Sequence, residues 1–213
     1  MQVEYNIEPI NTKIFIFLAE AYKSELNKKR TLKLLHLLEQ IGTDAQEIQF
    51  VLNQLKDSLV QISANMEKSL LPLGIEYTNI FRGTGPKSVF LYEAVHRSQE
   101  GLMYEGPFFE VKSCYEKFGF ETEPDWVEPE DHISVECQYL AFLSEKMAKG
   151  HDDGDFKKET FWQEQKIHFV REHFLQWVPQ VSVQVIQNTS SDFYKGLGIL
   201  TEAVCKQLSS DIN

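Results

Sequence analysis

Glu128-Pro129-Glu130-Asp131-His132 stands directly before a helical run that extends from Ile133 to Met147. The segment places a proline, three carboxylates and an imidazole at the mouth of a helix. Proline suits the first position of a helix, because the N–H that it lacks would have no partner there. Acidic side chains are favoured at the positive end of the helix dipole. The sequence therefore predicts that a helix starts here, with Pro129 at its first position.

His132 fits a plain helix start less well than its neighbours do. A protonated imidazole is disfavoured at the N-terminus of a helix, so a histidine beside carboxylates indicates a polar recognition site. Helix starts that combine proline with acidic residues are common, and a simple cap is the alternative interpretation.

Apolar residues recur at helical spacing along most of the chain. Pro107 is suited to a helix start and Gly119 to a helix end. Val181, Val183 and Val185 alternate as in a strand, but no partner strand is evident, so a short helix is predicted there. The sequence predicts an all-α fold of about nine or ten helices. Their predicted ranges are 12–22, 32–41, 43–62, 75–81, 107–118, 129–147, 156–177, 181–185 and 193–208, and residues 89–97 are predicted to form a short helix or a turn.

The composition describes an acidic, globular protein. Hydrophobic residues make up 42% of the 213 residues, which allows one large domain, or two small subdomains around a shared core. The net charge of −11 disfavours nucleic-acid binding and suits a basic partner. No apolar run approaches the roughly 20 residues of a membrane span. Residues 1–11 lack the features of a secretory signal, so we expect a cytoplasmic protein.

None of the common catalytic motifs is found in the chain. It has no GxSxG elbow, no HExxH pair and no CxxC pair, so we do not expect an enzyme. Cys114, Cys137 and Cys205 are odd in number and widely spaced, which fits reduced thiols better than disulfides or a zinc site. Residues 83–87 resemble a phosphate-binding loop only loosely, and residues 151–155 lack the spacing of an EF-hand. We therefore expect no cofactor and no metal ion.

For several aromatic residues, the first interpretation is a place in the hydrophobic core. Exposed together in a groove, they would instead receive an apolar peptide helix, because aromatic side chains offer large contact areas at low entropic cost. These residues are Tyr77, Phe81, Tyr92, Trp162 and Trp177.

Three separated segments together resemble the TorD/DmsD/NarJ family of cytoplasmic chaperones for redox enzymes. Residues 73–83 are similar to the family's E-Y-x-x-L-F-x-G segment, with Ile80 in place of leucine. Residues 128–132 match its E-P-x-D-H hinge motif in full. Residues 169–179 and the later Phe193-Tyr194 look like its F-x-x-x-H-x-x-x-W-x-P helix and F-Y pair.

A further segment, residues 92–95, is similar to the family's Y-E-S-V sequence, with Ala94 in place of serine. The resemblance covers residues 70–208, whereas the N-terminal third matches only in helical character. It implies one TorD-like helical domain with a hinge between two helical parts. Some members exchange C-terminal helices, so a monomer or a domain-swapped homodimer is expected. The N-terminal part, hinge and C-terminal part are residues 1–122, 123–132 and 133–213.

The resemblance also implies a function. The family binds the twin-arginine leader of a molybdopterin oxidoreductase, and often its apo-protein, and delays export until the cofactor is inserted. Asp131 and His132 match leader-binding positions, and Tyr77, Phe81 and Gly83 match positions near the groove. The resemblance also implies that Glu128 and Pro129 shape the hinge.

The chemistry of the residues agrees with this expectation. The carboxylates of Asp131 and Glu128 can accept forked, charge-assisted hydrogen bonds from arginine. Three alternatives stay open: a NarJ-like assembly factor for an enzyme that is not exported, a guanine-nucleotide-binding maturation factor, and a helical structural protein in which residues 128–132 form only a cap.

Overall fold

The structure of the protein, a computed structural model, describes residues 12–212; residues 1–11, for which the sequence predicts no secretory signal, lie outside it. Ten α-helices and one π-helical turn make up the described part, so the predicted all-α class is confirmed. The elements are α1 (Thr12–Lys23), α2 (Lys28–Glu39), α3 (Gln46–Ala64), α4 (Met66–Phe81), α5 (Glu93–Arg97), α6 (Gly106–Phe118), α7 (Ile133–Asp152), α8 (Phe156–Phe169), η1 (Val170–Phe174), α9 (Leu175–Asn188) and α10 (Asp192–Asp211).

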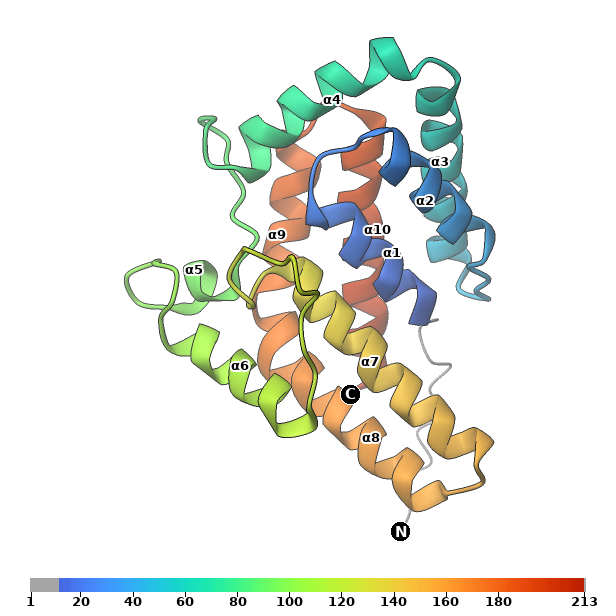
Figure 1. The fold of residues 1–213 in the computed structure, drawn as a ribbon, viewed down its shortest axis with the longest axis vertical. Coiled ribbons are helices and arrows are strands. Elements are labelled where there is room, and N and C mark those ends of the chain that lie inside the picture. Colours follow the sequence, from blue (N-terminus) through green and yellow to red (C-terminus); the bar gives the residue numbers. More distant parts are fainter. Residues whose placement is uncertain (1–11, 213) are drawn as a thin grey trace.

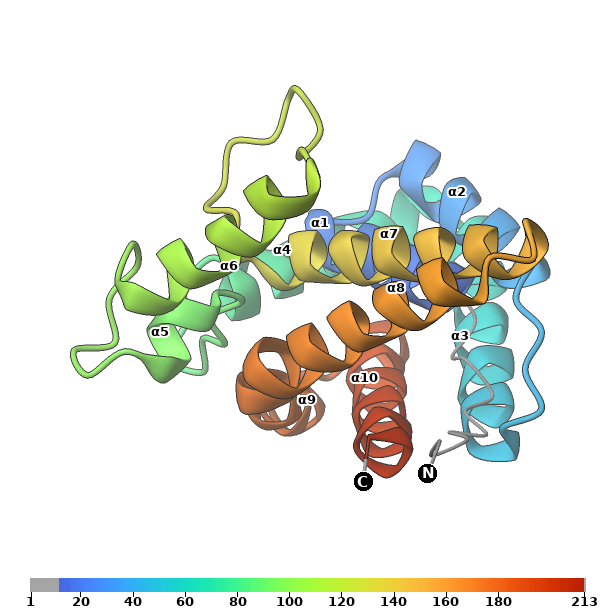
Figure 2. The same ribbon diagram turned by 90° about the horizontal axis from the view of Figure 1, so that it is seen from below.

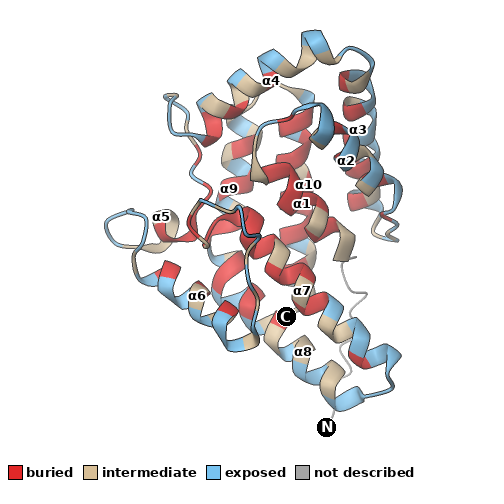
Figure 3. Cartoon of the chain, viewed as in Figure 1, coloured by how far each residue is buried: buried red, intermediate tan, exposed pale blue. Residues whose placement is uncertain are grey.

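Two helical hairpins and a central helix form the body of the molecule (Figure 1). Helices α7 and α8 pack along each other, as do α9 and α10. Helix α1 contacts α7, α2 and α10, and eight of its twelve residues are buried, as Figure 3 also shows. Because α1 comes from the N-terminal part and α7 and α10 from the C-terminal part, the two parts share one hydrophobic core.

Helix α4 begins at Met66 rather than at the predicted Ile75, and Pro72 lies inside it. Proline lacks the N–H that would bond to the carbonyl of Lys68 one turn earlier. Lys68 and Pro72 are both exposed, so water can pair with this carbonyl. A proline on the outer face therefore does not end the helix.

The chain from α8 to α9 is helical throughout, so the prediction of a separate short helix at residues 181–185 is wrong. The π-helical turn η1 interrupts the regular hydrogen bonding, and Pro179 lies inside α9 shortly after it. The turn also places His173 on the buried side.

Helices α5 and α6 project to one side of the body (Figure 2). Helix α6 ends where predicted, at Gly119, whose φ of 66° is the left-handed conformation typical of glycine after a helix. From there a connector without helix, residues 119–132, returns to the start of α7. No helix within residues 12–212 combines the length and the apolar character needed to cross a membrane.

Candidate functional site

The segment 128–132 precedes α7 but is not its first turn. Helix α7 begins at Ile133 with His132 as its N-cap, so the predicted start at Pro129 is wrong. The backbone N–H of Glu93 donates to the carbonyl of Asp131 at 3.0 Å, and that of Ile133 donates to the carbonyl of Leu91 at 2.9 Å. These bonds hold residues 131–133 in extended pairing with residues 91–93, so the helix starts only after them.

His132 caps α7 as a neutral group. Its Nδ1 accepts a hydrogen bond from the backbone N–H of Ser134 at 3.1 Å. Burial lowers the pKa of His132 to about 3, which leaves the lone pair free to accept. The ring lies against Tyr92 and Trp126, with centroids 5.2 and 5.4 Å apart. Because burial keeps the imidazole uncharged, His132 is not repelled by the positive end of the helix dipole.

Asp131 is fully buried and caps a second helix, α5. Its Oδ2 accepts from the backbone N–H of Ala94 at 2.8 Å, whereas its Oδ1 has no hydrogen-bond partner among the described residues. Burial raises the pKa of Asp131 to about 6, the bond from Ala94 opposes this shift, and the nearby carboxyl of Glu93 adds to it. Asp131 therefore ties the connector to α5, and one of its oxygens has no partner in the part of the chain that the structure describes.

Glu93 is a second buried carboxyl group in this cluster, and the sequence did not single it out as a site residue. Nδ1 of His173 lies 3.1 and 3.2 Å from its two oxygens, and Arg97 pairs with it one turn along α5. Nε2 of His173 lies 3.8 Å from Sγ of Cys114. Burial acts to lower the pKa of His173, but the hydrogen bonds with Cys114 and Glu93 raise it to about 9. The imidazole is therefore charged at neutral pH.

Glu136, in the first turn of α7, is the third buried carboxyl group. The indole N–H of Trp177 donates to its two oxygens at 3.1 and 3.3 Å. Burial, together with the carboxyls of Glu93 and Asp131, raises the pKa of Glu136 well above its usual range. A cluster of three neighbouring carboxyls thus links the connector, α5 and α7, and Trp177 joins α9 to it.

Glu128 is one of two residues of the motif that solvent reaches: a quarter of its side chain is exposed, as is a similar share of Glu130, which pairs with Lys112. Glu128 accepts a hydrogen bond from the hydroxyl of Tyr92 at 2.8 Å and forms an ion pair with Arg82. Burial alone would raise the pKa of Glu128, but the bonds from Arg82 and Tyr92 lower it overall. An arginine of the chain itself therefore already occupies this carboxylate.

Tyr77 and Phe81 lie in the core, with 2% and 5% of their surface exposed, as the first interpretation of these aromatics predicted. Tyr77 donates to the carbonyl of Tyr22 at 3.1 Å, and both rings contact Tyr194. They do not form an open groove in this conformation. Gly83 lies in the exposed loop after α4, where its φ of 69° favours glycine.

No three His, Cys, Asp or Glu side chains within residues 12–212 are placed to hold a metal ion. The structure shows the three cysteines unbonded to one another: Cys137 and Cys205 are buried, and Cys114 is half-buried.

Fold and site together define an all-helical protein in which a buried polar cluster holds the end of the connector before α7. Residues 43–182 match the family described as the nitrate reductase delta subunit, and the chain therefore belongs to that family. Its resemblance to the TorD-like chaperones is confirmed by relatives that are themselves named chaperones rather than enzymes.

Similar proteins include the chaperone protein TorD of Vibrio atlanticus, 23% identical over 90% of this chain and 86% of the relative. The perchlorate reductase assembly chaperone protein of Dechloromonas aromatica is 28% identical over 54% of this chain and 50% of the relative. A candidate redox enzyme maturation protein from Archaeoglobus fulgidus has the same fold, with a TM-score of 0.59 and 18% identity over 95% of this chain and 99% of that structure.

Proposed function

We propose that this protein is a cytoplasmic maturation chaperone for a molybdopterin oxidoreductase. It binds the twin-arginine leader, the apo-protein or both, and delays export until the cofactor is inserted. The observation that carries the proposal is the family match over residues 43–182, which includes the intact hinge motif. Relatives named TorD and perchlorate reductase assembly chaperone support a role in the assembly of such an enzyme.

The hinge motif is the proposed place of leader recognition. Glu128 supports this most directly, because it is partly exposed and already holds a guanidinium group, that of Arg82. Asp131 offers the unsatisfied Oδ1, which an arginine could pair with. Since Asp131 and His132 are buried, such pairing requires the hinge to move away from residues 91–94.

The same movement would serve the apolar part of a leader. Tyr77 and Phe81 lie at the end of α4 that leads to Arg82 and Gly83, and the Arg82 guanidinium lies 5.8 Å from the centre of the Tyr77 ring. Release of Arg82 from Glu128 would loosen this end of α4. Tyr77, Phe81 and Gly83 therefore belong to the proposed site in an opened form of the protein.

Calorimetric titration tests the proposal. The full-length protein is titrated with the leader of a molybdoenzyme whose gene neighbours its own, and with the same peptide after both arginines are changed to lysine. We expect micromolar or tighter binding that weakens with the lysine peptide and with Glu128→Gln, since guanidinium groups make the forked bonds. Glu39→Gln, an exposed glutamate on α2, is the matched control.

A NarJ-like assembly factor is the second candidate, because the matching family is described by a nitrate reductase subunit. Such a factor would bind the N-terminal segment of its enzyme without any twin-arginine pair. Binding to that segment, with no binding to leaders, would favour this candidate. Binding to neither peptide, and no binding to the apo-enzyme itself, would refute both.

A further inference from the structure

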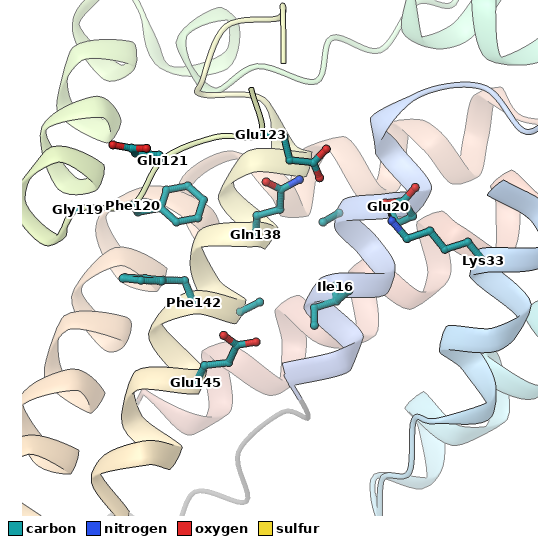
Figure 4. A pocket seen from close by; sticks show the side chains of 12 residues that line it. Ile16, Glu20, Lys33, Gly119, Phe120, Glu121, Glu123, Gln138, Phe142 and Glu145 are labelled. Carbon is teal, nitrogen blue, oxygen red and sulfur yellow. Dashed lines mark hydrogen bonds and ion pairs between the residues drawn. The ribbon is translucent and has the colours of Figure 1, made fainter. Parts of the chain in front are cut away.

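An open hollow of about 440 Å³ lies beside the connector, between α1, α2 and α7 (Figure 4). The sequence did not predict it, because its walls come from segments more than 100 positions apart. Its apolar lining is formed by side chains of α1, of the connector and of α7. These are Ile16, Ala19, Phe120, Ala141 and Phe142.

The apolar wall is held firmly in place. The ring centroid of Phe120 lies 5.0 Å from that of Tyr115, 5.2 Å from that of Tyr139 and 5.5 Å from that of Phe142. Tyr139 in turn donates a hydrogen bond to the carbonyl of Cys114 at 3.1 Å. Because these side chains are already packed, little conformational entropy is lost in ordering them when a ligand binds.

Charge at the rim is unbalanced, with four glutamates and one lysine around the apolar wall. Glu20 is already paired with Arg30 and Lys33, and Glu123 pairs with Lys23. The side chains of Glu121 and Glu145 are exposed and have no cation or hydrogen-bond partner within residues 12–212. Two unpaired carboxylates thus stand next to a preformed apolar surface.

We infer that this hollow docks a peptide segment in which an arginine or lysine stands beside apolar residues. The basic side chain pairs with Glu121 or Glu145, and its apolar neighbour packs against Phe120 and Phe142. The volume lies in the range of pockets that take a few side chains, not a folded partner. An acidic surface alone would attract any cation, and the apolar wall is what selects this kind of segment.

The inference deepens the proposed function and rests on it, because a twin-arginine leader combines basic and apolar residues in this way. Glu123 lies at the rim and also belongs to the hinge segment 123–132. A leader arginine that competes with Lys23 for Glu123 would contact the hinge directly. The hollow therefore offers a first contact that needs no opening of the buried Asp131 and His132.

A thermodynamic cycle tests this docking site. A synthetic peptide with two arginines before an apolar helical segment, and its Arg→Gln version, are titrated into the wild type and into the double variant Glu121→Gln, Glu145→Gln. We expect about tenfold weaker binding of the arginine peptide by the variant, and a smaller effect of Arg→Gln there than in the wild type. Phe142→Ala tests the apolar wall in the same way.

The matched control is Glu47→Gln with Glu67→Gln, two exposed glutamates on α3 and α4, which should bind the peptide within twofold of the wild type. If the arginine peptide binds equally well to the hollow variants and the wild type, the hollow is not the docking site, while the proposed function stands. If the wild type binds no such peptide, the docking site is refuted, whereas the proposed function is decided separately by the titration with the leader of the neighbouring molybdoenzyme. Unchanged far-UV circular dichroism of the charge variants excludes unfolding as the cause.

Discussion

His173 contacts Glu93 across 80 positions of the sequence, and its Nδ1 lies 3.1 and 3.2 Å from the two carboxylate oxygens. Both side chains are buried. The pair joins the π-helical turn η1 to α5, whose first turn is capped by Asp131 of the connector. The connector before α7 and the turn η1 between α8 and α9 are therefore linked through α5.

This ion pair predicts a loss of stability at alkaline pH. The pKa of His173 is about 9 in the folded protein and 6.5 ordinarily, so the folded state holds the proton more tightly. The pair contributes fully below about pH 6.5, and its contribution is lost as the pH rises through 9. We expect the urea midpoint of the wild type to decrease as the pH is raised from 6.5 to 9. The midpoint of His173→Gln should decrease less over the same pH range. The control is His36→Gln, which changes an exposed histidine. Parallel pH profiles for wild type and His173→Gln would contradict the ion pair.

Asp131 is predicted to act as a helix cap whose oxygen matters more than its charge. Asp131→Ala leaves the buried N–H of Ala94 unpaired, which should cost about 1–3 kcal/mol of unfolding free energy. Asp131→Asn keeps an acceptor oxygen and should cost less. Denaturant unfolding of both variants at pH 7 measures the difference. Equal destabilisation by the two substitutions would exclude the capping role.

Asp131 is also predicted to make the unfolding free energy depend on pH with the opposite sign to that of an ordinary carboxylate. The folded pKa of Asp131 is about 6, above its usual 3.8, so the folded state binds the proton more readily. Its contribution to stability therefore decreases as the pH rises from about 4 to 6. His132, with a pKa of about 3, contributes an opposite slope in this range, so the Asp131→Asn profile must be compared with the wild type and not interpreted alone.

The helices could be predicted largely from the sequence, because an apolar stripe is a local pattern. The start of α4 could not, since Pro72 is a helix breaker by local rules and is tolerated only because it faces water. The predicted helix start at Pro129 was wrong for a different reason. The residues that follow Pro129 pair with residues 91–93, and no local sequence pattern shows that pairing.

The sequence identified which residues form the candidate site but not that these residues are buried. Asp131 and His132 were identified through their motif, yet their burial depends on distant segments. Glu93 was noticed only as part of a resemblance, and its role requires His173 from another helix. The apolar wall around Phe120 likewise forms only when α1 and α7 meet.

Trp177 is predicted to stabilise the protein through its indole N–H as well as its packing. Trp177→Phe keeps an aromatic ring but removes the donor to the buried carboxyl of Glu136. An unpaired buried acceptor costs about 1–3 kcal/mol, and loss of ring volume adds to it. Trp162→Phe, at a half-buried position, is the matched control and should cost less. Thermal unfolding of the two variants measures the difference, and equal costs would assign the whole effect to packing.

Gly150 is predicted to be required at a close approach of α7 to the backbone of α8. A Cβ atom at this position would lie 2.7 Å from the backbone nitrogen of Glu159 and 3.0 Å from its Cα, contacts that no flexible side chain can relieve. Gly150→Ala must therefore push the two helices apart, at a cost of about 1–3 kcal/mol. Gly106→Ala is the control: its Cβ would meet nothing within 4 Å, and reduced backbone freedom should make it neutral or stabilising by up to about 1 kcal/mol. Chemical denaturation compares the two. Because alanine is otherwise favoured over glycine inside a helix, a Gly150→Ala protein as stable as the wild type would mean that the hairpin is wider than described.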